Sequence, residues 1–112
     1  MRRSEDFADV VRSGARRGTQ RVVVHLHGAT GSEEDTPLVG VVVSKAIGNA
    51  VDRNLVKRRL RGLLSSRLAD LEPGQRVVVR ALPAARGAAS SELARDLDAA
   101  LAGARRRIGA AR

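Results

Sequence analysis

The segment 43–61 constrains the possible folds more than any other part of the chain. It connects an apolar, β-branched strand at Leu38–Ser44 to a basic helix from about Ala50 to about Ala69, through a short stretch that contains Gly48. The strand lacks polar alternation, which is typical of a strand buried on both faces. A helix that is charged on one side and apolar on the other packs its apolar side on a core. The segment therefore predicts a sheet covered by a helix whose outer side is cationic.

Placing successive residues about 100° apart around the helix axis distinguishes two sides of this helix. The core side spans an arc of about 100° and holds Val56, Leu60, Leu63 and Leu64. The neighbouring arc, about 140° wide, carries Arg53, Asn54, Lys57, Arg58 and Arg61. Asp52 is the only acid of the segment, so these like charges favour binding of RNA or DNA over a merely solvated face. Leu55 lies apart from the core side, as a rim contact or an exposed apolar residue.

The charge of the whole chain favours the same kind of partner. The 112 residues carry a formal net charge of +9, which indicates nucleic acid. Arginine makes up 19 of the 21 cationic residues, but GC-rich genomes also produce this bias, so the choice of arginine adds little. Phe7 is the one aromatic residue, and phosphate contacts must therefore outweigh stacking on bases.

Length and periodicity predict one domain that spans residues 1–112, with several further elements. They are a short first helix at Ser4–Gly14, strands at Arg21–His27 and Arg76–Leu82, a solvated loop at 28–37, and a last helix that begins at Ser90 or Ser91. Arg16, Arg17 and Arg21 are expected to flank a turn before the strand Arg21–His27. Cysteine is absent, which excludes disulfides, and no apolar signal region is seen, so we expect a cytoplasmic protein.

Two clusters could carry chemistry of their own. His25 and His27 are two residues apart on a strand and share one face, where they could form a metal pair or a nuclease site. No third ligand or orienting carboxylate accompanies them, which favours two histidines at the sheet surface. The acidic run Glu33–Asp35 could bind a metal, but a solvated loop tip is the preferred interpretation. We therefore predict no catalytic and no metal-binding residue in this chain.

The order of residues in the central segment resembles the signature of the bacterial ribonuclease P protein component. The matching positions are Lys45, Gly48, Asn49, Ala50, Val51, Arg53, Asn54, Lys57, Arg58 and Arg61. The resemblance implies an α+β fold, a two-layer α/β sandwich of order α-β-β-β-α-β-α with a left-handed βαβ crossover. It also implies a division of labour. The RNA subunit and its Mg²⁺ hydrolyse precursor tRNA at the 5′ end, while the protein binds that RNA and the 5′ leader of the substrate.

The resemblance also assigns residues to these two contacts. Those expected to bind the catalytic RNA are Lys45, Asn49, Arg53, Asn54, Lys57, Arg58 and Arg61. Those expected to line the leader cleft, between the first helix and the sheet, are Phe7, Val11, Val24 and Leu26. The chain departs from the family at Leu55, where an arginine is usual, so one phosphate contact is missing. A structural ribosome-associated protein is the alternative, because related two-layer sheets occur among ribosomal proteins.

Overall fold

The computed structural model describes residues 15–27, 38–71 and 74–111. In chain order the strands and helices are β1 (Ala15–Gly18), β2 (Val22–His27), β3 (Leu38–Val42), α2 (Ala50–Ser65), β4 (Arg76–Ala81) and α3 (Ser90–Ala111). Short 3₁₀ turns lie between them at Lys45–Ile47, Leu68–Asp70 and Pro83–Ala85. The predicted first helix at Ser4–Gly14 and the loop at 28–37 lie outside the described residues.

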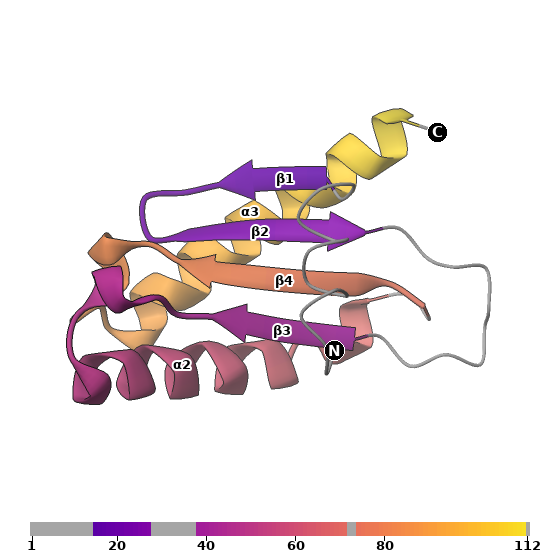
Figure 1. The fold of residues 1–112 in the computed structure, drawn as a ribbon. Coiled ribbons are helices and arrows are strands. Elements are labelled where there is room, and N and C mark those ends of the chain that lie inside the picture. Colours follow the sequence, from indigo (N-terminus) through magenta and orange to yellow (C-terminus); the bar gives the residue numbers. More distant parts are fainter. Residues whose placement is uncertain (1–14, 28–37, 72–73, 112) are drawn as a thin grey trace.

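The four strands form one sheet in the order β1-β2-β4-β3 (Figure 1). The pairs β1–β2 and β2–β4 are antiparallel, and β3–β4 is parallel. Arg16 and Arg17 lie in β1 and Arg21 directly precedes β2, so these arginines flank the turn between the two strands as predicted, but β1 itself was not predicted from its local sequence. Its sequence has no apolar alternation, so only pairing with β2 reveals it as a strand.

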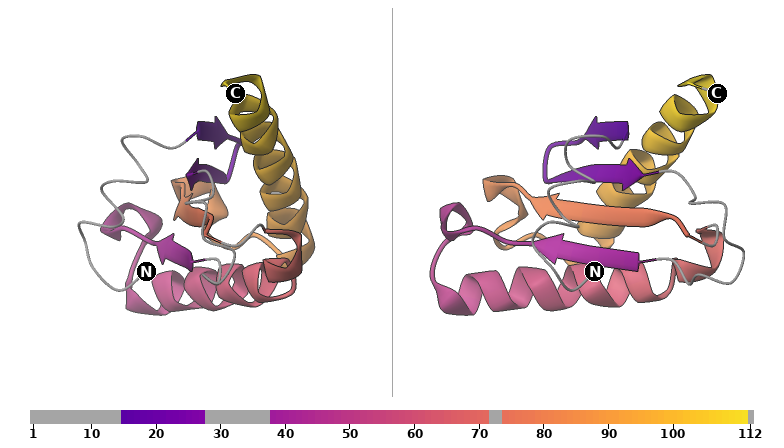
Figure 2. Two further views of the ribbon diagram at one scale, coloured as in Figure 1. Left: turned by 90° about the vertical axis from the view of Figure 1, so that its right-hand side faces the viewer. Right: turned by 45° about the vertical axis from the view of Figure 1, so that its right-hand side comes forward.

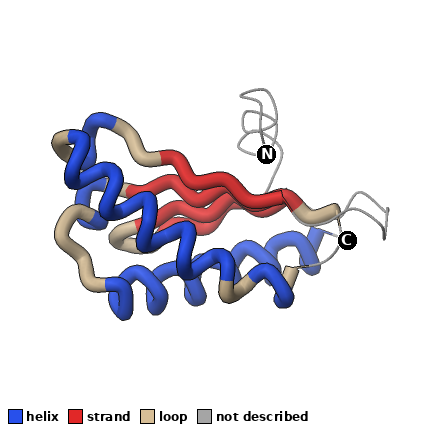
Figure 3. Tube along the Cα trace, turned by 90° about the horizontal axis from the view of Figure 1, so that it is seen from below, coloured by secondary structure: helices blue, strands red, loops and turns tan. Residues whose placement is uncertain are grey.

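The parallel strands β3 and β4 are joined through α2 by a left-handed crossover (Figure 1). Helices α2 and α3 lie on the same side of the sheet, which Figures 2 and 3 show from three directions. Parallel βαβ connections are right-handed in almost all proteins, so sequence rules alone favour the opposite hand. The two-layer sandwich that the resemblance implied is confirmed.

The hydrophobic core fills the space between the sheet and the two helices. The sheet contributes every second residue of its strands, Val22, Val24 and Leu26 from β2 and Val77 and Val79 from β4. The helices contribute Val56, Leu60 and Leu64 from α2 and Leu93, Leu97 and Leu101 from α3. The predicted core side of α2 is confirmed, with Leu63 packed at its margin.

Helix α2 ends at Ser65, before the predicted Ala69. The carbonyl of Leu63 accepts hydrogen bonds from the Ser66 hydroxyl at 2.8 Å and from Arg67 Nη1 at 2.9 Å. These side chains satisfy a carbonyl that has no partner within the helix, and a 3₁₀ turn follows at Leu68–Asp70. The end of the helix is therefore fixed by local polar contacts that hydrophobic periodicity does not report.

Candidate RNA interface

The start of α2 is fixed by a reciprocal cap between Asn49 and Asp52. Asn49 Oδ1 accepts the backbone N–H of Asp52 at 2.9 Å, and Asp52 Oδ2 accepts the backbone N–H of Asn49 at 3.3 Å. Gly48 has φ +148°, and a Cβ at this position would lie 2.5 Å from Asp52 Oδ2. Asp52 also pairs with Arg86 at 3.2 Å. The one acid of the segment is therefore used to start the helix and not to neutralise its basic side.

Three cations form a row along the side of α2 that faces the edge strand β3. We call Arg53, Lys57 and Arg61, which recur every four residues, the basic row. Arg53 and Lys57 line a hollow of about 320 Å³ together with Val43 and Ala50. Lys57 and Arg61 line a second hollow of about 380 Å³. The basic row therefore borders two hollows beside α2 that share Lys57 in their walls.

The basic row is not neutralised by the rest of the described structure. No carboxylate of residues 15–27, 38–71 or 74–107 forms an ion pair with Arg53, Lys57 or Arg61, nor with the neighbouring exposed Arg58. Within the described part of the chain, Arg53 Nε donates to the carbonyl of Asn49 alone, at 3.4 Å. Asn54 is exposed beside the row, and Lys45 is exposed in the turn that precedes the helix. The predicted RNA-contacting residues therefore lie together on one cationic surface, and Asn49 is the cap that orients it.

Three further residues of α2, Arg59, Leu55 and Val51, lie outside the basic row. Arg59 donates from Nη1 to the carbonyl of Ala88, so it joins α2 to the segment that starts α3. Leu55 is 36% exposed, and Val51 is also exposed, so both present apolar atoms at the outer surface of the helix. Leu55 is thus an exposed residue, one of the two alternatives that the sequence allowed.

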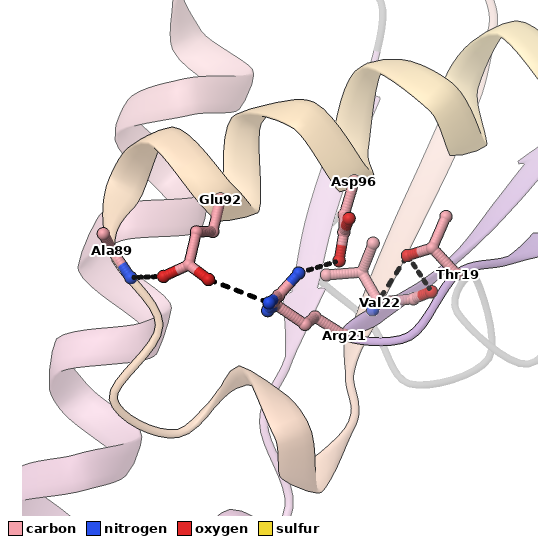
Figure 4. A network of polar contacts seen from close by, with 6 residues as sticks. All are labelled: Thr19, Arg21, Val22, Ala89, Glu92 and Asp96. Carbon is pink, nitrogen blue, oxygen red and sulfur yellow. Dashed lines mark hydrogen bonds and ion pairs between the residues drawn. The ribbon is translucent and has the colours of Figure 1, made fainter.

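Two acids of α3 are engaged by Arg21, which directly precedes β2. Figure 4 shows Arg21 between two residues of α3, with Glu92 at 2.8 Å and Asp96 at 3.2 Å. Glu92 also accepts the backbone N–H of Ala89 at 3.0 Å, which satisfies a donor at the start of that helix. These pairs dock α3 on the sheet, and they place negative charge away from the basic row.

The predicted leader-binding residues separate into two groups. Phe7 and Val11 lie outside the described residues. Val24 and Leu26 are each 0% exposed and lie in the core beneath the helices, which corrects their assignment to a cleft. Successive residues of a strand point to opposite faces, so the residues of β2 that face away from α2 and α3 are Val23, His25 and His27.

We call this second side of the sheet the far face. Its described residues are Arg16 and Gly18 from β1, Val23, His25 and His27 from β2, Leu38, Gly40 and Val42 from β3, and Arg76, Val78 and Arg80 from β4. Sequence reasoning did not select Arg16, Arg76 or Arg80. The alternation of residues in the strand 76–81 could have identified Arg76 and Arg80, because it places both arginines on the face that the core valines do not share.

His25 is only 2% exposed, which corrects its prediction as a surface histidine. Its Nε2 accepts a hydrogen bond from Arg80 Nε at 3.1 Å. Burial lowers the pKa of His25, and the nearby charges of Arg80 and Arg16 lower this pKa further. The imidazole is thus neutral, and its Nε2 already accepts a hydrogen bond. His25 is therefore not available as the general base of a two-histidine nuclease site. Among the described residues, no three His, Cys, Asp or Glu side chains gather as a metal ion requires.

Together these features define a class, that of small basic two-layer α/β proteins with a cationic helix surface suited to RNA phosphates. The sequence profile of the family Ribonuclease P matches residues 1–105. The Ribonuclease P protein component of Streptomyces griseus is 55% identical over 107 residues, covering 90% of this chain and 87% of its own length. That of Beutenbergia cavernae is 54% identical over 101 residues, covering 90% and 83%. The chain belongs to the ribonuclease P protein family.

Solved structures agree with this assignment. An RNase P protein mutant of Staphylococcus aureus, described as defective in mRNA degradation activity, matches with a TM-score of 0.82 at 26% identity, over 94% of this chain and 86% of its own. The RNase P protein of Thermotoga maritima, solved with 1-(4-fluorophenyl)-2-thiourea, shares the fold with a TM-score of 0.74 at 22% identity, over 87% and 92%. Within the described residues, no helix is both long and apolar enough to cross a membrane.

Proposed function

We propose that this chain acts in the cytoplasm as the protein subunit of ribonuclease P. It binds the catalytic RNA through the basic row and its neighbours, and it binds the 5′ leader of precursor tRNA across the far face. Both contacts promote maturation of the 5′ end of tRNA. The RNA subunit carries out the hydrolysis, so the protein needs no acid, base or nucleophile of its own.

The un-neutralised basic row on α2 is the observation that carries this proposal. Holding Arg53, Lys57 and Arg61 together without acids costs stability, and a polyanion that binds there relieves the repulsion. Arg53 and Arg61 present planar forks that suit phosphate oxygens, and Lys57 adds a point charge where the two hollows meet. Lys45, Asn54 and Arg58 extend the contact on either side, and Asn49 holds the helix start in place.

The leader contact is assigned to the arginines of the far face, because α2 and α3 occupy the other side of the sheet and the middle of the far face, at Val23, His25 and Val78, is buried. Phe7 and Val11 stay expectations for this contact, while Val24 and Leu26 are replaced by Arg16, Arg76 and Arg80, the accessible cations of the far face. Phe7 is the one aromatic residue in the whole sequence, so few platforms for base stacking exist. The leader is therefore held mainly through its phosphates.

Mg²⁺ is assigned to the RNA subunit. The described acids of the protein do not fit such a site, because no three of them gather, and Asp52, Glu92, Asp96 and Asp98 are each engaged by arginine. Divalent magnesium prefers carboxylate oxygens that converge in an octahedral arrangement. The proposed role of the protein is to screen phosphate repulsion, so that the assembled enzyme works at a lower Mg²⁺ concentration.

A cleavage assay tests this function. Precursor tRNA and the cognate catalytic RNA are mixed at low Mg²⁺, with and without the protein, and the rate and the substrate affinity are measured. The protein should raise at least one of the two. Arg53→Ala should weaken binding of the catalytic RNA by about 1–3 kcal/mol with little loss of folding, while Arg95→Ala, which removes an exposed charge on α3, should not. A protein that changes neither quantity, and that cosediments with ribosomal RNA instead, contradicts the proposal.

A further inference from the structure

The far face brings Arg16, His25 and Arg80 together from three adjacent strands. Arg16 in β1 lies directly opposite His25 in β2, and Arg80 in β4 pairs with Val23 on the other side of β2. Neighbouring strands are about 4.8 Å apart, so β1 and β4 are separated by about 10 Å across β2. Two arginine side chains can span that distance and converge above the histidine.

His25 fixes the direction of the Arg80 guanidinium. The hydrogen bond from Arg80 Nε to His25 Nε2, at 3.1 Å, requires a neutral imidazole whose proton is on Nδ1. It uses one of the five N–H groups of the guanidinium and leaves the Nη edge available. Because His25 is almost fully buried, this acceptor cannot swing away, so Arg80 loses little additional freedom when it binds a ligand.

The charge of the far face selects an anion as that ligand. Its described residues include Arg16, Arg76 and Arg80 but no Asp or Glu. On the helix side of the molecule, by contrast, Arg21 and Arg67 are both paired with carboxylates of α3. Arg21 and Arg67 are thus neutralised where they serve the fold, whereas no carboxylate of the described residues pairs with an arginine of the far face.

We propose that Arg16 and Arg80 form a binding site for a backbone phosphate of single-stranded RNA, and that His25 is a positioning residue that orients Arg80. The site deepens the leader-binding role proposed above and rests on it. The Nη edge of Arg80 donates two hydrogen bonds to the phosphate oxygens, and the exposed Arg16 adds a second cation. Such contacts do not depend on the base, which suits substrates whose leaders differ in sequence.

Binding of a fluorescent single-stranded oligouridine over a range of salt concentrations tests the site. Arg80→Ala and Arg16→Ala should each weaken binding about tenfold, and each should reduce the slope of log K against log salt by about 0.7, the value for one phosphate contact on a single strand. His25→Phe keeps a ring in the buried position but removes the acceptor, and should weaken binding about threefold to tenfold. His25→Gln restores an acceptor and should recover most of the loss. Arg95→Ala is the control for a charge removed elsewhere.

Thermal unfolding of every variant shows whether it is folded. If His25→Phe unfolds, Arg16→Ala and Arg80→Lys still test the phosphate site. Arg16 is exposed, and a lysine at position 80 keeps the positive charge but lacks the planar guanidinium that binds two phosphate oxygens. Unchanged oligouridine binding in Arg16→Ala and Arg80→Ala, or an equal loss in Arg95→Ala, overturns the site. Binding of the full catalytic RNA separates the two proposals, since it should depend on Arg53 and much less on Arg80.

Discussion

Arg67 binds Asp98 of α3 through two parallel contacts, Nε to Oδ1 at 2.5 Å and Nη2 to Oδ2 at 3.0 Å. The hydrogen bond from Arg67 is the main reason that the pKa of the Asp98 carboxyl is lowered, and the same bond raises the pKa of Arg67. Because Arg67 also donates to the carbonyl of Leu63, a single side chain ties the end of α2 to α3. The orientation of the RNA-binding helix therefore depends on a residue outside the basic row.

Removing this link should destabilise the fold without removing an RNA contact. Arg67→Ala should lower the free energy of unfolding by about 1–2 kcal/mol, because two charge-assisted hydrogen bonds and a helix-end contact are lost. Asp98→Ala should cost less, since Arg67 keeps its bond to Leu63. Urea unfolding at pH 7 measures both. The loss in Asp98→Ala should disappear as the pH falls below 3.8, the ordinary pKa of aspartate, and through the lower pKa of the folded chain, whereas the part of the Arg67→Ala loss that comes from the Leu63 contact should remain. Equal losses at pH 7 contradict the double role of Arg67.

The neutral state of His25 makes the fold sensitive to mild acid. Its pKa is lowered in the folded chain, so below about pH 6.5, the ordinary value, the unfolded chain takes up a proton that the folded chain resists. Stability should therefore decline as the pH falls below 6.5. Urea unfolding at pH 7.5 and pH 5.5 should show a smaller decline for His25→Gln than for the parent, with His27 present in both. An identical decline rules out His25 as the source.

Adjacent arginines on α2 should give opposite results. Arg58 is exposed and has no carboxylate partner in the described chain, whereas Arg59 donates to the carbonyl of Ala88. Arg58→Ala should weaken binding of the catalytic RNA by about 1–3 kcal/mol and leave the melting temperature nearly unchanged. Arg59→Ala should lower the free energy of unfolding by about 1 kcal/mol and affect RNA binding less. A filter-binding assay and a thermal melt on each variant provide the comparison. The reverse pattern would show that the two roles are exchanged.

The cap of α2 should be separable from its RNA contacts. Asn49→Ala removes the side-chain acceptor of the Asp52 N–H and should cost about 1 kcal/mol of stability. Gly48→Ala should cost more, because φ is +148° and the added Cβ would meet Asp52 Oδ2. Asn49→Ser retains a capping oxygen, so chemical denaturation should find it close to the parent. If Asn49→Ser weakens RNA binding as strongly as Asn49→Ala, the amide itself contacts RNA.

Leu55 offers a test by gain of function. It is 36% exposed and follows Asn54 in the helix, and Leu55→Arg restores the residue usual in the family at this position. The variant should bind the catalytic RNA more tightly, by about 1 kcal/mol, at moderate salt. Leu55→Gln, which is polar but uncharged, is the matched control and should not tighten binding. Weaker binding by Leu55→Arg would show that Leu55 packs against the RNA.

The sequence predicted the helix surfaces better than the sheet surfaces. The apolar arc of α2 contains Val56, Leu60 and Leu64, and its period of 3.6 residues determines directly which side is buried. Strand β2 gives no such signal, because Val22, Val23 and Val24 are all apolar and the two faces cannot be told apart without the register. For this reason Val24 was assigned to a cleft although it belongs to the core.

Polar contacts between distant residues were also beyond reach from the sequence. Arg80 and His25 are 55 positions apart, and Arg67 and Asp98 are 31 apart, so no local pattern relates them. The family resemblance supplied the order of elements and the hand of the crossover, which general rules would have chosen wrongly. It did not identify which arginines serve the fold, since that depends on which carboxylates the fold brings near.

Strand β4 lies between β2 and β3, although it follows both of them in the chain. A nascent chain that ends before Arg76 therefore lacks the strand that joins its two earlier strands, and the core side of α2 has only part of its sheet to pack on. The cationic helix is synthesised before the surface that orients it. During translation, a chain of this order acquires its RNA-binding geometry late, after β4 has closed the sheet and α3 has followed it out of the ribosome.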